Sequence, residues 1–284
     1  MSTLRTAWIG ILAGALLAGP ARAEQIPDTP VLYLPYLTEA PAIDGDLSEW
    51  RDAAFTDGVW DIQRLSHEPW FQVWRNRLTD HGSDAAPEPH PDDDLAARYY
   101  TAWDDTWFYM GATVRDNVND VTDPEHEPER WYFKDSICWF VEAPRDAVPE
   151  TFSRGANAFC FIADEARPDY GAWWRHGTTT DSYVEEPIPE DAVDYAVIVD
   201  PRGDGSGDFR LEARVNMAAT FGVSDPDWQA PQIGHVYGLE IVHCDPDGGP
   251  YGGHFIMYGT GDDDATWAQT VLTGPLAPIE RATE

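Results

Sequence analysis

Apolar and polar residues alternate along short stretches of this chain, a period that is typical of β-strands. In residues 135–142, Ile137, Trp139 and Val141 fall on one face, whereas serine, cysteine, phenylalanine and glutamate fall on the other. The apolar face predicts core packing. The second face has two interpretations: an open aromatic shelf that binds a ligand, or a face that other layers cover.

Similar short runs recur between turns rich in glycine, proline and aspartate, and no long helical period is present. Residues 96–117 predict a hairpin that turns at Asp104-Asp105. In residues 41–50, a tight turn and a helical turn are expected to bring Trp50 inward. Further strands are predicted at 31–37, 156–164, 194–200, 208–215, 234–245, 253–259 and 270–276. We therefore expect an all-β protein, a single jelly-roll-like antiparallel β-sandwich.

Residues 1–23 have the pattern of a signal peptide: a positive charge, an apolar run at 6–19 and a small-x-small end at Ala23. The run is short for a membrane span, so cleavage after Ala23 is expected without membrane insertion. The mature chain, 24–284, would then be secreted or periplasmic. Within it, residues 76–94 are rich in proline and aspartate and predict an exposed insertion.

The formal net charge is −33 at pH 7, and Lys134 is the sole lysine. Such a surface repels polyanions, which excludes nucleic acid and anionic membranes as partners. A high acidic content with little lysine also fits a salt-adapted organism, since salt screens self-repulsion. The oligomeric state stays open.

No nucleophile elbow, phosphate loop, zinc-ligand pair or dinucleotide fingerprint occurs, so the sequence predicts a protein that is not an enzyme. With 51 acidic residues, a carboxylate pair by itself does not indicate a glycosidase.

The informative residues are tryptophans expected in loops, because indole rings stack on the C–H faces of sugars. The candidates are Trp131, Trp173, Trp174 and Trp267. The alternative for each is that it closes one end of the sandwich.

The turn at residues 200–208 spaces Asp200, Asp204 and Asp208 four residues apart. Calcium needs several oxygen ligands, so these carboxylates are candidate calcium ligands. An ordinary hairpin turn is the favoured alternative, because the spacing does not match an EF-hand.

The chain has three cysteines, Cys138, Cys160 and Cys244. In an exported protein, one disulfide and one odd thiol are expected. No CxxC or CxxCH motif occurs, which excludes c-type haem attachment and a thioredoxin-like site.

Several segments, in their order and spacing, resemble the family 9 carbohydrate-binding module. These are PAIDGDLSEW, WDDTWFYMGATVRDN, RWYFKDSICWFVE, DYAVIVD with DFRLEARV, QIGHVYGLEIVHCD and ATWAQTVLTGPL. The resemblance covers residues 41–276 apart from the insertion. It implies a jelly-roll-like sandwich that binds an oligo- or polysaccharide without catalysis, linked to polysaccharide breakdown. It also makes calcium a candidate cofactor.

In the family, the sugar lies between two tryptophans at one end of the sandwich. The resemblance assigns the first position to Tyr132 or its neighbour Trp131, and the second to Trp267. Asp264 stands where the family has an asparagine that hydrogen-bonds the ligand. Trp173 and Trp174 would add further contacts.

Two positions depart from the family pattern. Cys138 stands where the family has a sugar-binding glutamate, and Cys160 where it has the facing arginine. Because facing positions on adjacent strands reach disulfide distance, the resemblance implies a Cys138–Cys160 disulfide on the binding face. Such a bridge would replace two polar groups that bind sugar.

Two other functions stay open. One is a haem-binding electron-transfer subunit on a related sandwich, with axial ligands drawn from Met110, Met257, Lys134 and His254. The other is a structural module that has lost sugar binding, which the two cysteine replacements would favour.

Overall fold

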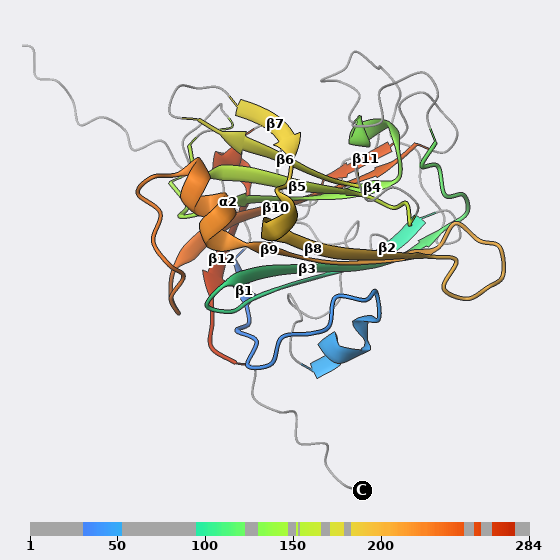
Figure 1. Ribbon diagram of the computed structural model, residues 1–284, viewed down its shortest axis with the longest axis horizontal. Coiled ribbons are helices and arrows are strands. Elements are labelled where there is room, and N and C mark those ends of the chain that lie inside the picture. Colours follow the sequence, from blue (N-terminus) through green and yellow to red (C-terminus); the bar gives the residue numbers. More distant parts are fainter. Residues whose placement is uncertain are drawn as a thin grey trace, which may run out of the picture.

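The computed structural model describes residues 31–52, 95–122, 130–146, 152, 154–165, 171–178, 183–246, 253–256 and 263–275. In these residues the fold is two β-sheets packed face to face, with one short α-helix (Figure 1). The predicted signal peptide and the insertion at 76–94 lie outside the described residues. No helix among the described residues is long and apolar enough to cross a membrane.

The larger sheet has the order β1-β12-β10-β4-β5-β6-β7, and β11 also pairs with β10. Its strands are β1 (Val31–Leu34), β4 (Ser136–Glu142), β5 (Ala156–Ile162), β6 (Ala172–Gly177), β7 (Tyr183–Pro187), β10 (Val236–Asp245), β11 (Gly253–Ile256) and β12 (Ala268–Leu272). β1 pairs with β12 in parallel, a departure from the fully antiparallel expectation. No hairpin links these two strands, so chain connection does not impose an antiparallel pairing.

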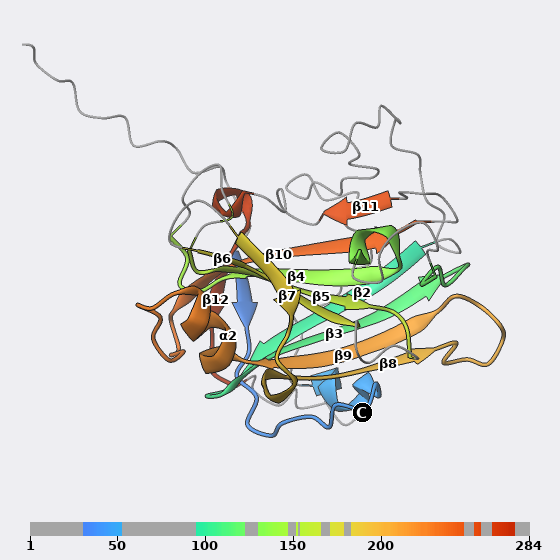
Figure 2. The same cartoon turned by 45° about the horizontal axis from the view of Figure 1, so that its top comes forward.

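The smaller sheet has the order β2-β3-β9-β8. Its strands are β2 (Leu95–Trp103), β3 (Trp107–Asp116), β8 (Val193–Val199) and β9 (Phe209–Asn216). The helix α2 (Met217–Ser224) lies at one end of the sandwich, where it contacts β5 and β9 (Figure 2). The 3₁₀ helices are η1 (Leu47–Asp52), η3 (Trp131–Phe133), η4 (Glu190–Ala192) and η5 (Asp264–Thr266).

The expected β-sandwich is confirmed, and so is the 96–117 hairpin. The expectation of a loop around the two adjacent tryptophans is wrong, because both lie within β6. That segment is a strand because it pairs with β5 on one side and with β7 on the other. Pairing with the strands on both sides thus decides its conformation.

Strand β4 is buried along its whole length. Ile137, Trp139 and Val141 point between the sheets into the main core. Cys138 and Phe140 belong to a separate cluster on the outer face of the larger sheet. The covered interpretation of β4 is therefore the correct one, and a binding surface on this face of the sheet would have to lie outside β4 itself.

On the outer face of the smaller sheet, the N-terminal segment packs against β9 through Glu212 (Figure 1). The Trp50 indole donates to Glu212 Oε1 at 2.6 Å, and the amides of Asp44 and Gly45 donate to Oε2 at 2.9 Å each. Gly45 has a φ of +83°, the left-handed turn that brings these amides inward. Trp50 is buried, as the sequence predicts.

Replacing Glu212 by alanine is expected to lower the free energy of unfolding by about 3 kcal/mol, because three donors lose their acceptor. Urea denaturation of the variant measures this loss. The matched control is Glu190→Ala, at an exposed position, which should change stability by less than about 0.5 kcal/mol. Equal stability of the two variants would show that Glu212 does not hold the N-terminal segment.

Candidate functional site

The outer face of the larger sheet carries an aromatic and sulfur-rich cluster, here called the outer cluster. Its buried members are Trp131, Cys138, Phe140, Phe152, Ala156, Ala158, Cys160, Ile162, Val242, Cys244 and Trp267, with Val121, Tyr132 and Trp173 partly buried against it. Because side chains alternate along each strand, the strand residues of this cluster lie opposite the main core.

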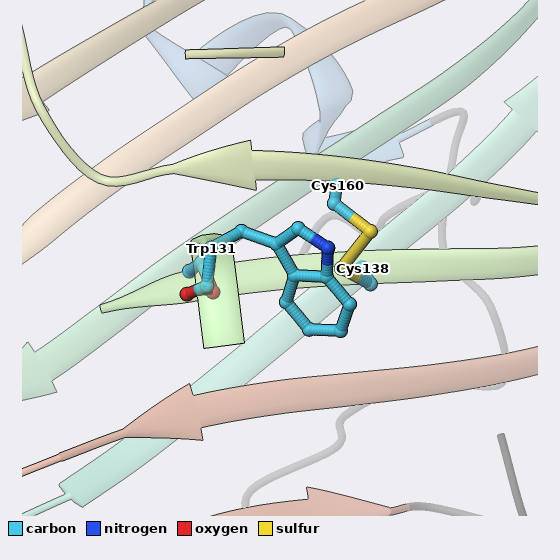
Figure 3. Close-up of a disulfide and its surroundings, with 4 residues drawn as sticks. Trp131, Cys138 and Cys160 are labelled. Atoms are coloured by element: carbon cyan, nitrogen blue, oxygen red, sulfur yellow. Dashed lines mark hydrogen bonds between the residues drawn. A yellow bond between two sulfur atoms is a disulfide. The ribbon is translucent and has the colours of Figure 1, made fainter. Parts of the chain in front are cut away.

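Cys138 and Cys160 are disulfide-bonded in the middle of the outer cluster, and the indole of Trp131 lies beside the bridge (Figure 3). The two cysteines face each other in the β4–β5 register, with Cα atoms 4.0 Å apart. Both side chains are fully buried. The bridge therefore gives this face an apolar floor at the two positions where the family resemblance places polar sugar ligands.

A cleft of about 240 Å³ opens beside this bridge, between η3 and the strands β6 and β7. Its lining residues are Arg130, Trp131, Tyr132, Cys160, Trp173, Trp174, Arg175 and Glu185. Segments distant in sequence thus build an aromatic hollow with charged groups in its wall.

Local hydrogen bonds fix η3, which forms one wall of the cleft. Lys134 Nζ donates to the carbonyl of Arg130 at 3.0 Å, and Ser136 Oγ donates to the carbonyl of Trp131 at 2.9 Å. Arg130 Nη1 donates to the Tyr132 hydroxyl at 2.8 Å. The Trp131 and Tyr132 rings meet edge to face, with centroids 5.3 Å apart. Trp131 is largely buried and supports the wall, whereas Tyr132 is partly exposed.

The opposite wall comes from β6, where the two adjacent tryptophans have different environments. Trp173 pairs with Cys160 in register, packs against the outer cluster and is partly exposed. Trp174 belongs to the main core, donates from Nε1 to Asn157 Oδ1 at 3.0 Å and stacks on His176. Adjacent residues of a strand face opposite sides, so Trp173 is a platform and Trp174 is a core residue.

The expectation that Trp267 offers a stacking face does not match the structure. Its side chain is fully buried, edge to face with Phe140 at 5.6 Å and with Phe152 at 6.0 Å. Asp264 is also fully buried and lies with Glu142 and Asp146, not in the cleft. Two of the predicted sugar contacts thus lie apart from the cleft that holds Trp131, Tyr132 and Trp173.

The calcium expectation for the 200–208 turn does not match the structure either. Arg202 Nε lies 2.8 Å from Asp208 and 3.3 Å from Asp204. The Asp200 carboxylate accepts from the amides of Asp204 and Gly205, both at 3.0 Å. The three carboxylates thus form ion pairs with Arg202 or accept hydrogen bonds from turn amides, as in an ordinary hairpin turn.

A different set of carboxylates has the character of a cation site. Asp116 ends β3, Asp135 precedes β4 and Asp245 ends β10, and all three are buried. One oxygen of each lies within 4.8 Å of the others. Within the described part of the chain, Asp135 Oδ1 has no hydrogen-bond partner, although Oδ2 accepts from the Asp120 amide. Burial, with the charges of Asp116 and Asp245, raises the pKa of Asp135 well above its usual value.

These three carboxylates fit a hard cation such as Ca²⁺, which takes oxygen ligands and cancels the repulsion between buried charges. A second group, Glu142, Asp146 and Asp264, also brings its oxygens within 4.8 Å. Burial, together with the hydrogen bond with Asp146, raises the pKa of Glu142 to about 10. In this second group Asp146 is exposed, whereas all three carboxylates of the first group are buried.

The candidate haem ligands among the described residues are not brought together. Met110 lies in the main core between the sheets, whereas Lys134 belongs to the segment that carries the cleft wall. Met257 and the side chain of His254 lie outside what the structure describes.

Comparison with known proteins gives structural matches only. No family model and no curated protein matches the chain. A family 9 carbohydrate-binding module from Caldicellulosiruptor kristjanssonii in complex with cellotriose has a TM-score of 0.53 and 14% identity, covering 89% of this chain and 97% of that one. The same module in complex with glucose has the same score and identity, with 88% and 100% covered.

A putative carbohydrate-binding protein from Bacteroides uniformis ATCC 8492 has a TM-score of 0.50 and 11% identity, covering 86% of this chain and 99% of that one. The fold therefore matches that of family 9 modules over most of the chain. At these identities the likeness shows the fold alone.

Sequence reasoning missed the charged residues of the cleft, Arg130, Arg175 and Glu185. A signal for Arg175 was present, because it lies two residues from Trp173 and so shares its face of the strand. Recognising that signal requires assigning residues 172–177 to a strand.

Proposed function

We propose that this chain is an exported, non-catalytic carbohydrate-binding protein whose ligand lies in the cleft between η3 and β6. The observation that carries the proposal is the aromatic lining of that cleft, with Tyr132 on one wall and Trp173 on the other. Flat rings stack on the C–H faces of a sugar ring with little loss of conformational entropy, since their own rotamers are already fixed by packing.

The described lining of the cleft lacks the carboxylate pair of a glycosidase. Among the described residues that line it, Glu185 is the one carboxylate, whereas glycoside hydrolysis commonly needs two across the scissile bond. The described carboxylates whose pKa values burial raises, Asp135, Glu142 and Glu212, do not line the cleft. Binding without catalysis is the function that this geometry supports best.

Calcium is the cofactor that we assign to Asp116, Asp135 and Asp245. The residues come from β3, the start of β4 and the end of β10, so a cation there would link the two sheets. Asp135 is two residues from Phe133, which ends η3. The ion would supply charge compensation to the three carboxylates and would thereby support the cleft wall that carries Tyr132.

The test is a binding screen of mature protein, residues 24–284, against a panel of neutral and acidic trisaccharides that includes cellotriose and trigalacturonate. Titration calorimetry is expected to detect at least one ligand. A folded protein that binds none of them would contradict the proposal.

An absorbance spectrum of the purified protein tests the haem-binding alternative. A Soret band would favour that alternative over sugar binding.

A further inference from the structure

The cleft contains two arginines in a protein that has few basic residues. The chain carries 18 lysines and arginines against 51 aspartates and glutamates. Yet among the described residues that line this one cleft, Arg130 and Arg175 stand against the single carboxylate of Glu185. The described lining of the cleft therefore carries a net charge opposite in sign to that of the protein as a whole.

Aromatic rings hold Arg175 in place. Its guanidinium carbon lies 3.8 Å from the centroid of the Tyr183 ring and 4.5 Å from that of Phe152. Both contacts restrict the position of the guanidinium. A guanidinium that packing already restricts loses little side-chain entropy when it binds an anion.

Arg130 lies on the opposite wall, beside Tyr132. Its guanidinium donates to the Tyr132 hydroxyl at 2.8 Å, which fixes it next to a candidate stacking ring. Each wall of the cleft therefore combines an aromatic ring with an arginine: Tyr132 with Arg130, and Trp173 with Arg175. The Cys138–Cys160 bridge beside the cleft offers no polar group to a ligand, so the charged side chains of the walls, Arg130, Arg175 and Glu185, are the main polar groups that a ligand meets.

From this juxtaposition we infer that the cleft selects acidic saccharides, with a uronate carboxylate bound by Arg175 and Arg130 while the sugar ring stacks on Trp173. This inference rests on the proposed function and names its ligand class. Planar carboxylates match the guanidinium fork, and charge-assisted hydrogen bonds of this kind are about twice as strong as neutral ones.

The test compares trigalacturonate, trimannuronate and triglucuronate with their methyl esters, which have nearly the same shape without the charge. Calorimetry in 0.15 M salt is expected to give at least one acid a dissociation constant about tenfold or more below that of its ester. In Arg175→Gln and in Arg130→Gln this ratio should fall towards one. Arg175→Lys should retain part of it, because it keeps the charge and loses the fork.

Arg210→Gln is the matched control, since Arg210 is a partly exposed arginine on the other sheet. Its acid-to-ester ratio should equal that of the wild type. Thermal unfolding of each variant shows that it is folded, and Arg130→Gln serves as the second test if loss of Arg175 destabilises the protein.

Four results would overturn the inference. Equal affinity for an acid and its ester, or binding of cellotriose with no binding of any acid, would refute it and leave the proposed function standing. An unchanged ratio in both arginine variants would refute the assigned residues. Binding of no trisaccharide at all would overturn the proposed function as well.

Discussion

Reducing the Cys138–Cys160 disulfide is expected to lower the free energy of unfolding by about 3 kcal/mol. The bridge closes a loop between residues 22 positions apart, and reduction gives the unfolded chain that conformational freedom back. Both cysteines are fully buried beside Trp131, so the folded state keeps its packing while the unfolded state gains entropy. Urea denaturation with and without dithiothreitol measures the difference.

The double variant Cys138→Ala/Cys160→Ala provides the internal control, because dithiothreitol should no longer change its stability. Cys244, the remaining cysteine, is buried in the outer cluster without a disulfide. Cys244→Ala should therefore retain the full response to reductant. A wild-type protein that unfolds at the same urea concentration in both redox states would contradict the assigned bridge.

Calcium at a hundredfold excess over its dissociation constant is expected to stabilise the protein by about 2.7 kcal/mol. For a domain of this size, that corresponds to a rise in Tm of roughly 5–10 °C. The reason is the cluster of Asp116, Asp135 and Asp245, whose buried charges repel one another until a cation compensates them. Differential scanning calorimetry with calcium and with EDTA measures the shift.

Asp135→Asn should abolish that shift, and in EDTA the variant should be at least as stable as the wild type, because one buried charge is gone. The matched control is Asp204→Asn, which removes a carboxylate from the 200–208 turn that Arg202 already pairs. That variant should keep the full calcium response. The reverse outcome would be a calcium-induced rise in Tm that is lost in Asp204→Asn and kept in Asp135→Asn. That result would show that calcium binds in the 200–208 turn instead.

The sandwich could be predicted from sequence because its signals are local. Strand alternation, the Asp-Gly turn before Trp50 and the hairpin turn at Asp104-Asp105 each lie within about ten residues, and the structure has all three. The assignment of residues 172–177 failed because pairing on both sides, and not local propensity, makes that segment a strand.

The site was only partly predictable, because it depends on residues far apart in the chain. The position of Trp267 in the sequence matches that of a stacking tryptophan in the family, but its ring packs against Phe140 and Phe152. No local sequence pattern predicts that contact. The buried carboxylate cluster likewise joins the ends of β3 and β10 to the start of β4. By contrast, Trp131, Tyr132 and Trp173 were named from aromatic content and resemblance, and one cleft unites them.

The most direct test of the account is the affinity of Trp173→Ala for the trisaccharide that binds best in the screen. Trp173 is the partly exposed tryptophan of the cleft, and loss of its ring is expected to weaken binding about tenfold or more, equal to about 1.4 kcal/mol. Trp107→Ala is the control, because Trp107 is a partly buried tryptophan on the smaller sheet that packs under Arg214. Wild-type affinity in Trp107→Ala and weakened binding in Trp173→Ala would place the sugar in the cleft, whereas unchanged affinity in Trp173→Ala would contradict that location.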